Sequence, residues 1–250
     1  YWLGPKSVSK PETDVGIVDQ FYTQSPNFTD EAFGLLKGLN LQVKVYRDKE
    51  VTVELYRELS TVGSKLIILR VHAGVSEELE NSTFLFTAEE YSKSKYITEQ
   101  LSDQVMPGWV SPDANPVFAV SPSFIQNSMK GEFQGTTIVL SSCFGLTTNH
   151  LAEAFYARGA KVFISWDERV SLEHTDRATL CLLRALLVKG MPVREAVAEV
   201  MEEVGPDPIY EGVLGYYPSE NGNHVLSLSS VISVPTVSYT HLRAHETVLD

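Results

Sequence analysis

Two short runs of almost uninterrupted apolar residues constrain the fold of this chain more than any other feature. Lys65–Val71 reads KLIILRV and Thr136–Ser141 reads TTIVLS. Runs of this length, rich in β-branched residues and leucine, predict strands that are covered on both faces, as in a parallel sheet. Because such a sheet needs helices on both of its faces, the runs indicate an α/β fold.

Strand and helix patterns alternate along most of the chain. The expected strands cover 15–21, 41–46, 65–71, 136–141, 161–165 and 212–217, and the expected helices cover 29–38, 52–59, 123–130, 147–158, 172–189 and 193–203. This alternation predicts a mostly parallel, doubly wound sheet. Between Ala73 and Pro116 the pattern loosens, with one expected helix over 91–105, and we interpret this stretch as functional loops.

We expect one α/β domain over residues 14–226. Residues 1–13 contain two prolines and predict an extended lead-in. Residues 227–250 are expected to lie outside the domain. From about residue 237 this tail reads VSYTHLRAHETVLD, which resembles the peptide that translated sequencing-adapter DNA gives, so its two histidines are assigned no function.

Composition argues against several functional classes. The net charge of −12, from 20 Lys and Arg against 32 Asp and Glu, argues against a nucleic acid or an anionic membrane as the main partner. No apolar run approaches the roughly 20 residues that span a bilayer. Two cysteines exclude a disulfide framework and a Cys-rich zinc site, and no metal or other cofactor motif is present. The chain begins at Tyr1 rather than Met, so we expect natural N-terminal residues to be missing, and the location, cytoplasmic or exported, stays open.

The two buried strands lead into potentially reactive groups. KLIILRV is followed by His72, and TTIVLS is followed by Ser142 and Cys143. Ligands of an open parallel sheet bind beyond the carboxyl ends of its strands. Each group lies close to a glycine, and Cys143 precedes an expected helix whose positive end favours a thiolate. A lone Cys or His is more often structural, and it is their joint placement that favours a Cys–His site.

These residues resemble a known family. A His near a Gly after one apolar strand, and Ser-Ser-Cys at the end of the next, are similar to the caspase–hemoglobinase clan of cysteine peptidases. Within the clan, the stretch VLSSCFGLTTNHLAEAFYARGAKVFISWDERV is most similar to the CHAT branch, and separases and gingipain-type peptidases share the framework. The resemblance covers residues 62–200. It implies a caspase-like three-layer sandwich and a cysteine endopeptidase that acts on proteins or peptides.

The resemblance also implies roles for particular residues. Cys143 would be the nucleophile, and His72 the general acid that protonates the leaving amine. The backbone N–H groups of Gly74 and Cys143 would form the oxyanion hole. Trp166 and Asp167 match a Trp-Asp pair of separases, in which the acid binds a basic side chain. Asp167 would therefore form the floor of a pocket for Arg or Lys before the scissile bond.

Two departures from the family pattern affect this interpretation. The family places Gly directly after its His, whereas here Ala73 intervenes before Gly74, so either residue could be the oxyanion donor. The interval of 71 residues between His72 and Cys143 is rather long for the family, and the loosely patterned insert accounts for it.

Two other functions stay open. One is an inactive caspase-like scaffold or sensor module, in which Ala73 would mark a decayed oxyanion hole. The other is a Cys hydrolase of the class I amidotransferase type, which would place His174 or His224, rather than His72, beside Cys143.

Overall fold

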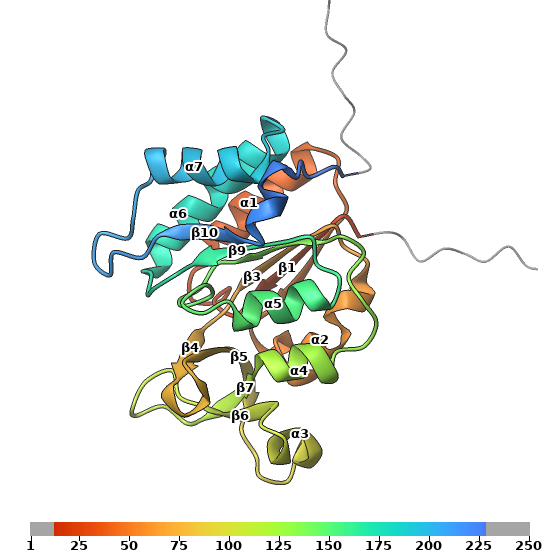
Figure 1. The fold of residues 1–250 in the computed structure, drawn as a ribbon, viewed down its shortest axis with the longest axis vertical. Helices are drawn as coiled ribbons and strands as arrows, with labels where there is room; N and C mark the ends of the chain where they lie inside the picture. Colours follow the sequence, from red (N-terminus) through yellow and green to blue (C-terminus); the bar gives the residue numbers. More distant parts are fainter. Residues whose placement is uncertain (1–12, 229–250) are drawn as a thin grey trace, which may run out of the picture.

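A six-stranded sheet forms the centre of the described structure, a computed structural model that covers residues 13–228 (Figure 1). All of its strands pair in parallel except the last, which runs antiparallel to its neighbour. The strands are, in spatial order, β10 (Leu214–Tyr217), β9 (Val162–Trp166), β8 (Thr137–Leu140), β3 (Leu66–Arg70), β1 (Val15–Asp19) and β2 (Val43–Arg47). The predicted mostly parallel α/β sheet is therefore confirmed. Except for Thr13, the expected lead-in lies outside the described residues, as does the adapter-like segment.

Helices cover both faces of this sheet (Figure 1). One face carries α1 (Asn27–Gly38), α6 (Leu172–Leu183), its π-helical continuation (Arg184–Val188) and α7 (Val193–Glu203), and the other carries α2 (Val53–Glu58), α4 (Pro122–Asn127) and α5 (His150–Ala157). Side chains alternate between the faces along each strand, so that Ile68 packs in one apolar cluster and Leu69 in the other. Short 3-10 turns cover Asp48–Glu50, Leu59–Val62, Glu77–Leu79 and Ser219–Asn223.

The loosely patterned stretch after His72 is a second, antiparallel sheet. Its strands lie in the order β4 (Ala73–Ser76), β5 (Ser82–Glu90), β7 (Val117–Val120) and β6 (Val105–Gly108). The interpretation of this stretch as loops is therefore wrong. The expected helix over 91–105 shrinks to α3 (Ile97–Leu101), because the chain from Val105 pairs with β7 instead.

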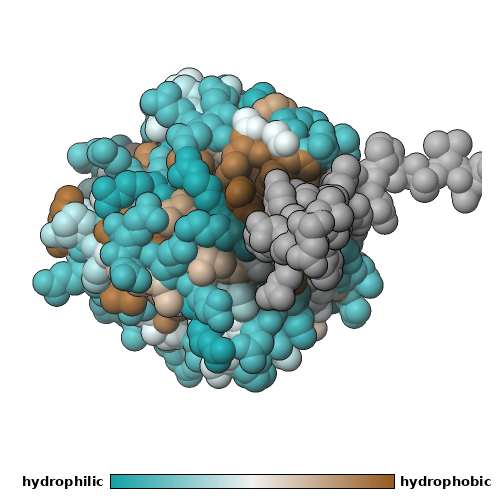
Figure 2. All heavy atoms as spheres, turned by 90° about the horizontal axis from the view of Figure 1, so that it is seen from above, coloured by the Kyte–Doolittle hydropathy of each residue, from teal (hydrophilic) through white to brown (hydrophobic). Residues whose placement is uncertain are grey.

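The strand order places the site. Numbered along the chain, the strands of the large sheet lie in the order 2-1-3-4-5-6, which reverses direction between β1 and β3. Ligands of such sheets bind at this switch point, beyond the carboxyl ends of the strands. Seen from the side of α1, α6 and α7, the surface is mostly hydrophilic with scattered apolar patches (Figure 2). None of the helices within residues 13–228 combines the length and the apolar character that crossing a membrane requires.

Candidate active site

Strand register brings His72 and Cys143 to the same edge of the large sheet. β3 and β8 are parallel neighbours, and their last pair is Leu69 and Leu140. Every pair of these strands is offset by 71 residues, which is also the interval between His72 and Cys143. The strands stay bonded past this pair, since the N–H of Ser141 donates to the Leu69 carbonyl at 2.9 Å. His72 and Cys143, called the dyad below, therefore leave the sheet at matching positions.

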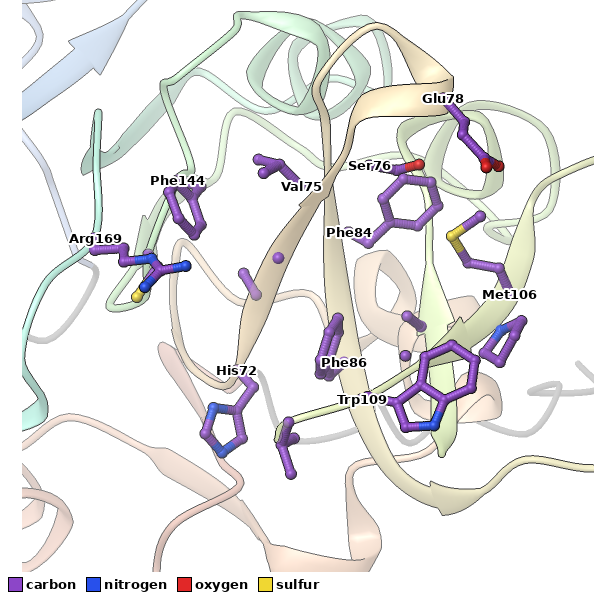
Figure 3. Close-up of a pocket in the computed structure, with 17 residues that line it drawn as sticks. His72, Val75, Ser76, Glu78, Phe84, Phe86, Met106, Trp109, Phe144 and Arg169 are labelled. Atoms are coloured by element: carbon purple, nitrogen blue, oxygen red, sulfur yellow. The ribbon is translucent and has the colours of Figure 1, made fainter. Parts of the chain in front are cut away.

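Two cavities are lined by both residues of the dyad. The larger, of about 690 Å³, lies between the small sheet and the loop after β9. Figure 3 shows His72 and Arg169 on one side of it, and Met106 and Trp109 on the other. The smaller, of about 220 Å³, is also lined by residues that follow β1, and so lies at the switch point of the sheet. A ligand in the larger cavity would therefore lie close to the dyad.

His72 is held by its backbone and by an aromatic neighbour. Its N–H donates to the side-chain oxygen of Gln20 at 2.8 Å, and the Gln20 amide donates to the Thr87 carbonyl at 2.8 Å. The ring lies edge-on to Phe21, with centroids 4.5 Å apart. No described residue hydrogen bonds to either ring nitrogen of His72. Burial lowers the pKa of His72, so the imidazole is neutral at neutral pH and can accept a proton.

Cys143 is half-buried and protonated at neutral pH. Its Sγ donates to the carbonyl of Val170 at 3.6 Å. Burial raises the pKa of the Cys143 thiol, while the guanidinium of Arg169 acts in the opposite direction and Glu168 adds to the rise. The thiolate must therefore be generated by a base, and the neutral imidazole of His72 is suited to this task.

The turn after Cys143 depends on a glycine. Phe144 has a φ of 62°, and its N–H donates to the Glu168 carbonyl at 3.0 Å. A Cβ on Gly145 would lie 2.1 Å from the Oγ of Ser165 on β9. A side chain at position 145 would overlap the Ser165 side chain, so glycine allows the turn after Cys143 to pack against β9.

Pairing within the small sheet bears on the oxyanion donor. The N–H of Phe86 donates to the His72 carbonyl at 2.9 Å, and Gly74 lies opposite Phe84. Because bonded pairs alternate every second residue in an antiparallel ladder, the N–H of Gly74 is directed at β5. The N–H of Ala73 is directed at the outer edge of β4, whose residues line the larger cavity. The strand pairing therefore favours the N–H of Ala73, rather than that of the expected Gly74, as the oxyanion donor.

The other two predicted site residues, at and just after the end of β9, have hydrogen-bond partners other than the dyad. Trp166 is buried, and its Nε1 donates to the hydroxyl of Thr175 at 2.9 Å. Asp167 is exposed, and its Oδ1 accepts the N–H of Val213 at 2.8 Å. Neither residue lines a cavity that contains the dyad. The charged side chain beside Cys143 in the larger cavity is Arg169.

Sequence reasoning missed a buried ionic group behind His72. Arg70 is completely buried, and its Nη1 lies 2.7 Å from Oδ1 of Asp19. The same guanidinium binds both oxygens of Asp176, at 2.7 and 2.8 Å. Phe21 lies between this group and the dyad, since its ring contacts both the Arg70 guanidinium and the His72 imidazole. The one signal in the sequence is an arginine inside an apolar strand, which requires a buried partner.

The alternative histidines have other contacts. His174 is buried, and its Nε2 donates to the carbonyl of Gly205 at 3.0 Å. Neither His174 nor His224 lines a cavity that contains Cys143. The geometry therefore does not favour an amidotransferase-like arrangement.

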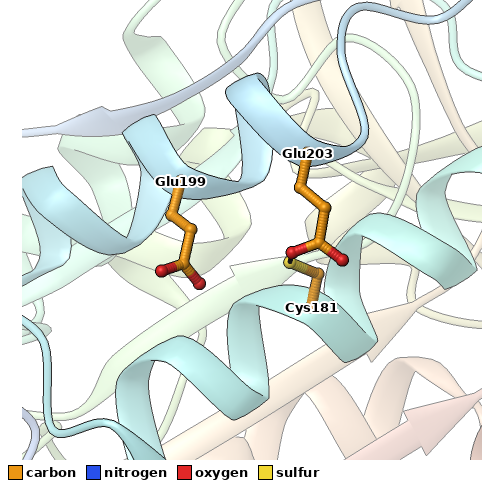
Figure 4. A group of neighbouring side chains, drawn as sticks. All are labelled: Cys181, Glu199 and Glu203. Atoms are coloured by element: carbon orange, nitrogen blue, oxygen red, sulfur yellow. Dashed lines mark hydrogen bonds between the residues drawn. The ribbon is translucent and has the colours of Figure 1, made fainter.

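One group of side chains within residues 13–228 has the spacing of a metal site. It consists of Cys181, Glu199 and Glu203 (Figure 4). The thiol of Cys181 donates to Glu203 at 3.3 Å, and Glu199 already pairs with Lys189 at 2.9 Å. Burial, and then Glu203, raise the pKa of Cys181 to about 11. These internal partners account for the group, which lies on α6 and α7 away from the dyad.

Comparison with known proteins does not assign the chain to a family. No protein-family model matches it, and neither does any curated protein. The evidence for a function is therefore the geometry of the dyad and its cavities.

Proposed function

We propose that this protein is a cysteine endopeptidase of caspase-like fold, in which Cys143 and His72 cleave a peptide bond. The observation that carries the proposal is the shared register of these residues at the ends of two central strands, above cavities that both of them line. The mostly parallel sheet with helices on both faces supports the caspase-like architecture. A neutral imidazole and a protonated thiol that line one cavity are the starting state that a base-activated nucleophile needs.

The reaction proceeds in two stages. The thiol proton of Cys143 passes to His72 as the sulfur attacks the scissile carbonyl carbon, and the carbonyl electron pair moves to the oxygen. The oxyanion is stabilised by the N–H groups of Cys143 and Ala73. His72 returns the proton to the amine as the C–N bond breaks, which leaves a thioester. Water then loses a proton to His72 and attacks the thioester carbonyl. As the C–S bond breaks, His72 returns this proton to the sulfur, which releases the acid and restores the thiol.

The proposal is tested by cleavage of an internally quenched peptide library. We expect wild type to cleave, and Cys143→Ala and His72→Ala to lose roughly a thousandfold or more in kcat/KM. Cys181→Ala is the matched control, because this second cysteine lies away from the cavity, and it should cleave like wild type. Full activity of Cys143→Ala would refute the mechanism.

The position of Asp167 does not support the basic preference that the resemblance implies. Its carboxylate lies outside the cavities of the dyad, and Arg169 lines the larger one. The preference is measured by comparing kcat/KM for peptides with Arg, Ala or Asp before the scissile bond. If Asp167 did bind a basic side chain, Asp167→Asn would slow cleavage after Arg and leave cleavage after Ala unchanged.

A non-catalytic peptide-binding module is the second candidate. One observation favours it: no described residue hydrogen bonds to a ring nitrogen of His72, so no third group orients the imidazole as a base. This candidate predicts no cleavage of any library peptide, together with equal peptide binding by wild type and Cys143→Ala.

A further inference from the structure

The two faces of the small sheet have different neighbours. Leu85 and Phe118 belong to the apolar cluster that lies against the large sheet. Phe84 and Phe86 belong to a separate, smaller cluster. Because side chains alternate along a strand, this second pair points to the opposite face, and that face lines the larger cavity. Phe84 and Phe86 are themselves buried, and Met106 packs against their cluster, so the wall of the larger cavity is apolar on this side.

Two glycines leave room for the Phe86 ring on this face. A Cβ on Gly74 would lie 3.2 Å from the ring of Phe86, and a Cβ on Gly108 would lie 3.0 Å from it. The Phe86 ring occupies the space that side chains at these positions would need, and it forms a buried part of the cavity wall. Met106 and Trp109 stand beside it in Figure 3, and Trp109 is 53% exposed. Exposed aromatic surface in a concave site is typical of a ligand pocket.

This apolar wall lies close to the dyad. The ring of Phe86 lies 6.5 Å from the ring of His72, centroid to centroid, and both residues line the same cavity of about 690 Å³. An extended peptide advances about 3.3 Å per residue. A peptide side chain that contacts this wall therefore belongs to a residue within about two or three positions of the bond that the dyad reaches.

We propose that Phe86, Met106 and Trp109 form an apolar subsite that binds a large apolar or aromatic side chain of the peptide substrate. This inference rests on the proposed function and names the substrate class. The subsite is selective because a large apolar side chain is removed from water when it binds there. A small side chain leaves the aromatic surface in contact with water, and a charged side chain loses its own hydration.

The first test measures selectivity. The probes are internally quenched octapeptides in which one Phe is moved through an Ala/Ser background. We expect one position of Phe to raise kcat/KM roughly tenfold to a hundredfold over Ala. Trp109→Ala and Met106→Ala should reduce this ratio severalfold. The control Ile209→Ala removes a 68%-exposed side chain outside the cavity and should leave the ratio unchanged. An unchanged ratio in Trp109→Ala, with the fold verified by thermal melting, overturns the subsite.

A second test separates the subsite from the catalytic proposal. Cys143→Ala protein is titrated with the best Phe octapeptide and its Ala counterpart, and the fluorescence of Trp109 reports binding. We expect tighter binding of the Phe peptide and loss of most of the signal in Cys143→Ala/Trp109→Phe. Selective binding without cleavage by wild type would refute the peptidase and support the subsite. Cleavage without any Phe preference would support the peptidase and refute the subsite.

Discussion

At the scale of single residues, the protonation of the dyad decides how the site reacts. Burial raises the pKa of Cys143 and lowers the pKa of His72. The thiol is therefore protonated, and the imidazole neutral, at neutral pH.

We predict that iodoacetamide alkylates Cys143 at a rate that rises with pH through a midpoint above that of an ordinary thiol, about 8.5. The reason is that only the thiolate reacts, and burial delays its formation. Mass spectrometry of the Cys143 peptide over a pH series measures the rate. A plateau already reached below pH 6 would show a preformed thiolate and contradict the prediction.

Two neighbouring charges act on the same thiol in opposite directions. The Arg169 guanidinium stabilises the thiolate and the Glu168 carboxylate destabilises it. We predict that Arg169→Gln raises the pKa of Cys143 and slows its alkylation at a given pH, whereas Glu168→Gln lowers the pKa and speeds alkylation. The same pH series serves both variants. If both variants shifted the pKa of Cys143 in the same direction, the two charges would not act on the thiol by electrostatic interaction.

At the scale of elements, the buried ionic group joins β1, β3 and α6. Arg70 is completely buried, and the Asp176 side chain is 15% exposed. Asp176→Ala leaves Arg70 paired with Asp19 but removes the acceptors of two buried guanidinium N–H groups, so we predict that it lowers the free energy of unfolding by about 2–3 kcal/mol. Urea denaturation measures the change. Glu173→Ala, an exposed carboxylate on the same helix, should change it by less than about 0.5 kcal/mol, and equal effects would contradict the role of the pair.

At the scale of the whole molecule, the site belongs to two sheets. The large sheet supplies the dyad, and the small sheet, inserted between β3 and β8, supplies the opposite wall of the cavity. A ligand that bridges them binds the native state only.

We predict that a peptide aldehyde, which adds reversibly to a thiol, stabilises the protein against heat. At a concentration 100 times its Kd the stabilisation should be about 2.7 kcal/mol, seen as a higher Tm. Cys143→Ala should lose most of this stabilisation, because no thiohemiacetal forms, and Cys181→Ala should retain it. Equal stabilisation of wild type and Cys143→Ala would place the aldehyde elsewhere.

The sequence by itself determined the strands of the large sheet and the edge at which the dyad lies. Apolar runs and helical spacing are local signals, so they can be recognised without knowledge of the fold. The strand expected over 65–71 is observed over Leu66–Arg70, and the strand expected over 136–141 is observed over Thr137–Leu140. From parallel strands alone it follows that His72 and Cys143 leave the sheet at one edge.

Tertiary structure decided the small sheet, the partners of Arg70 and the lining of the cavity. Three strands of the small sheet have only four residues, too few for a periodicity to emerge, and they exist because they pair with β5 and with each other. Arg70 finds its two carboxylates 51 and 106 residues away in the chain. Asp167 lies two residues from Arg169, yet of the two only Arg169 lines the larger cavity. Such contacts depend on register and long-range packing, which local patterns do not encode.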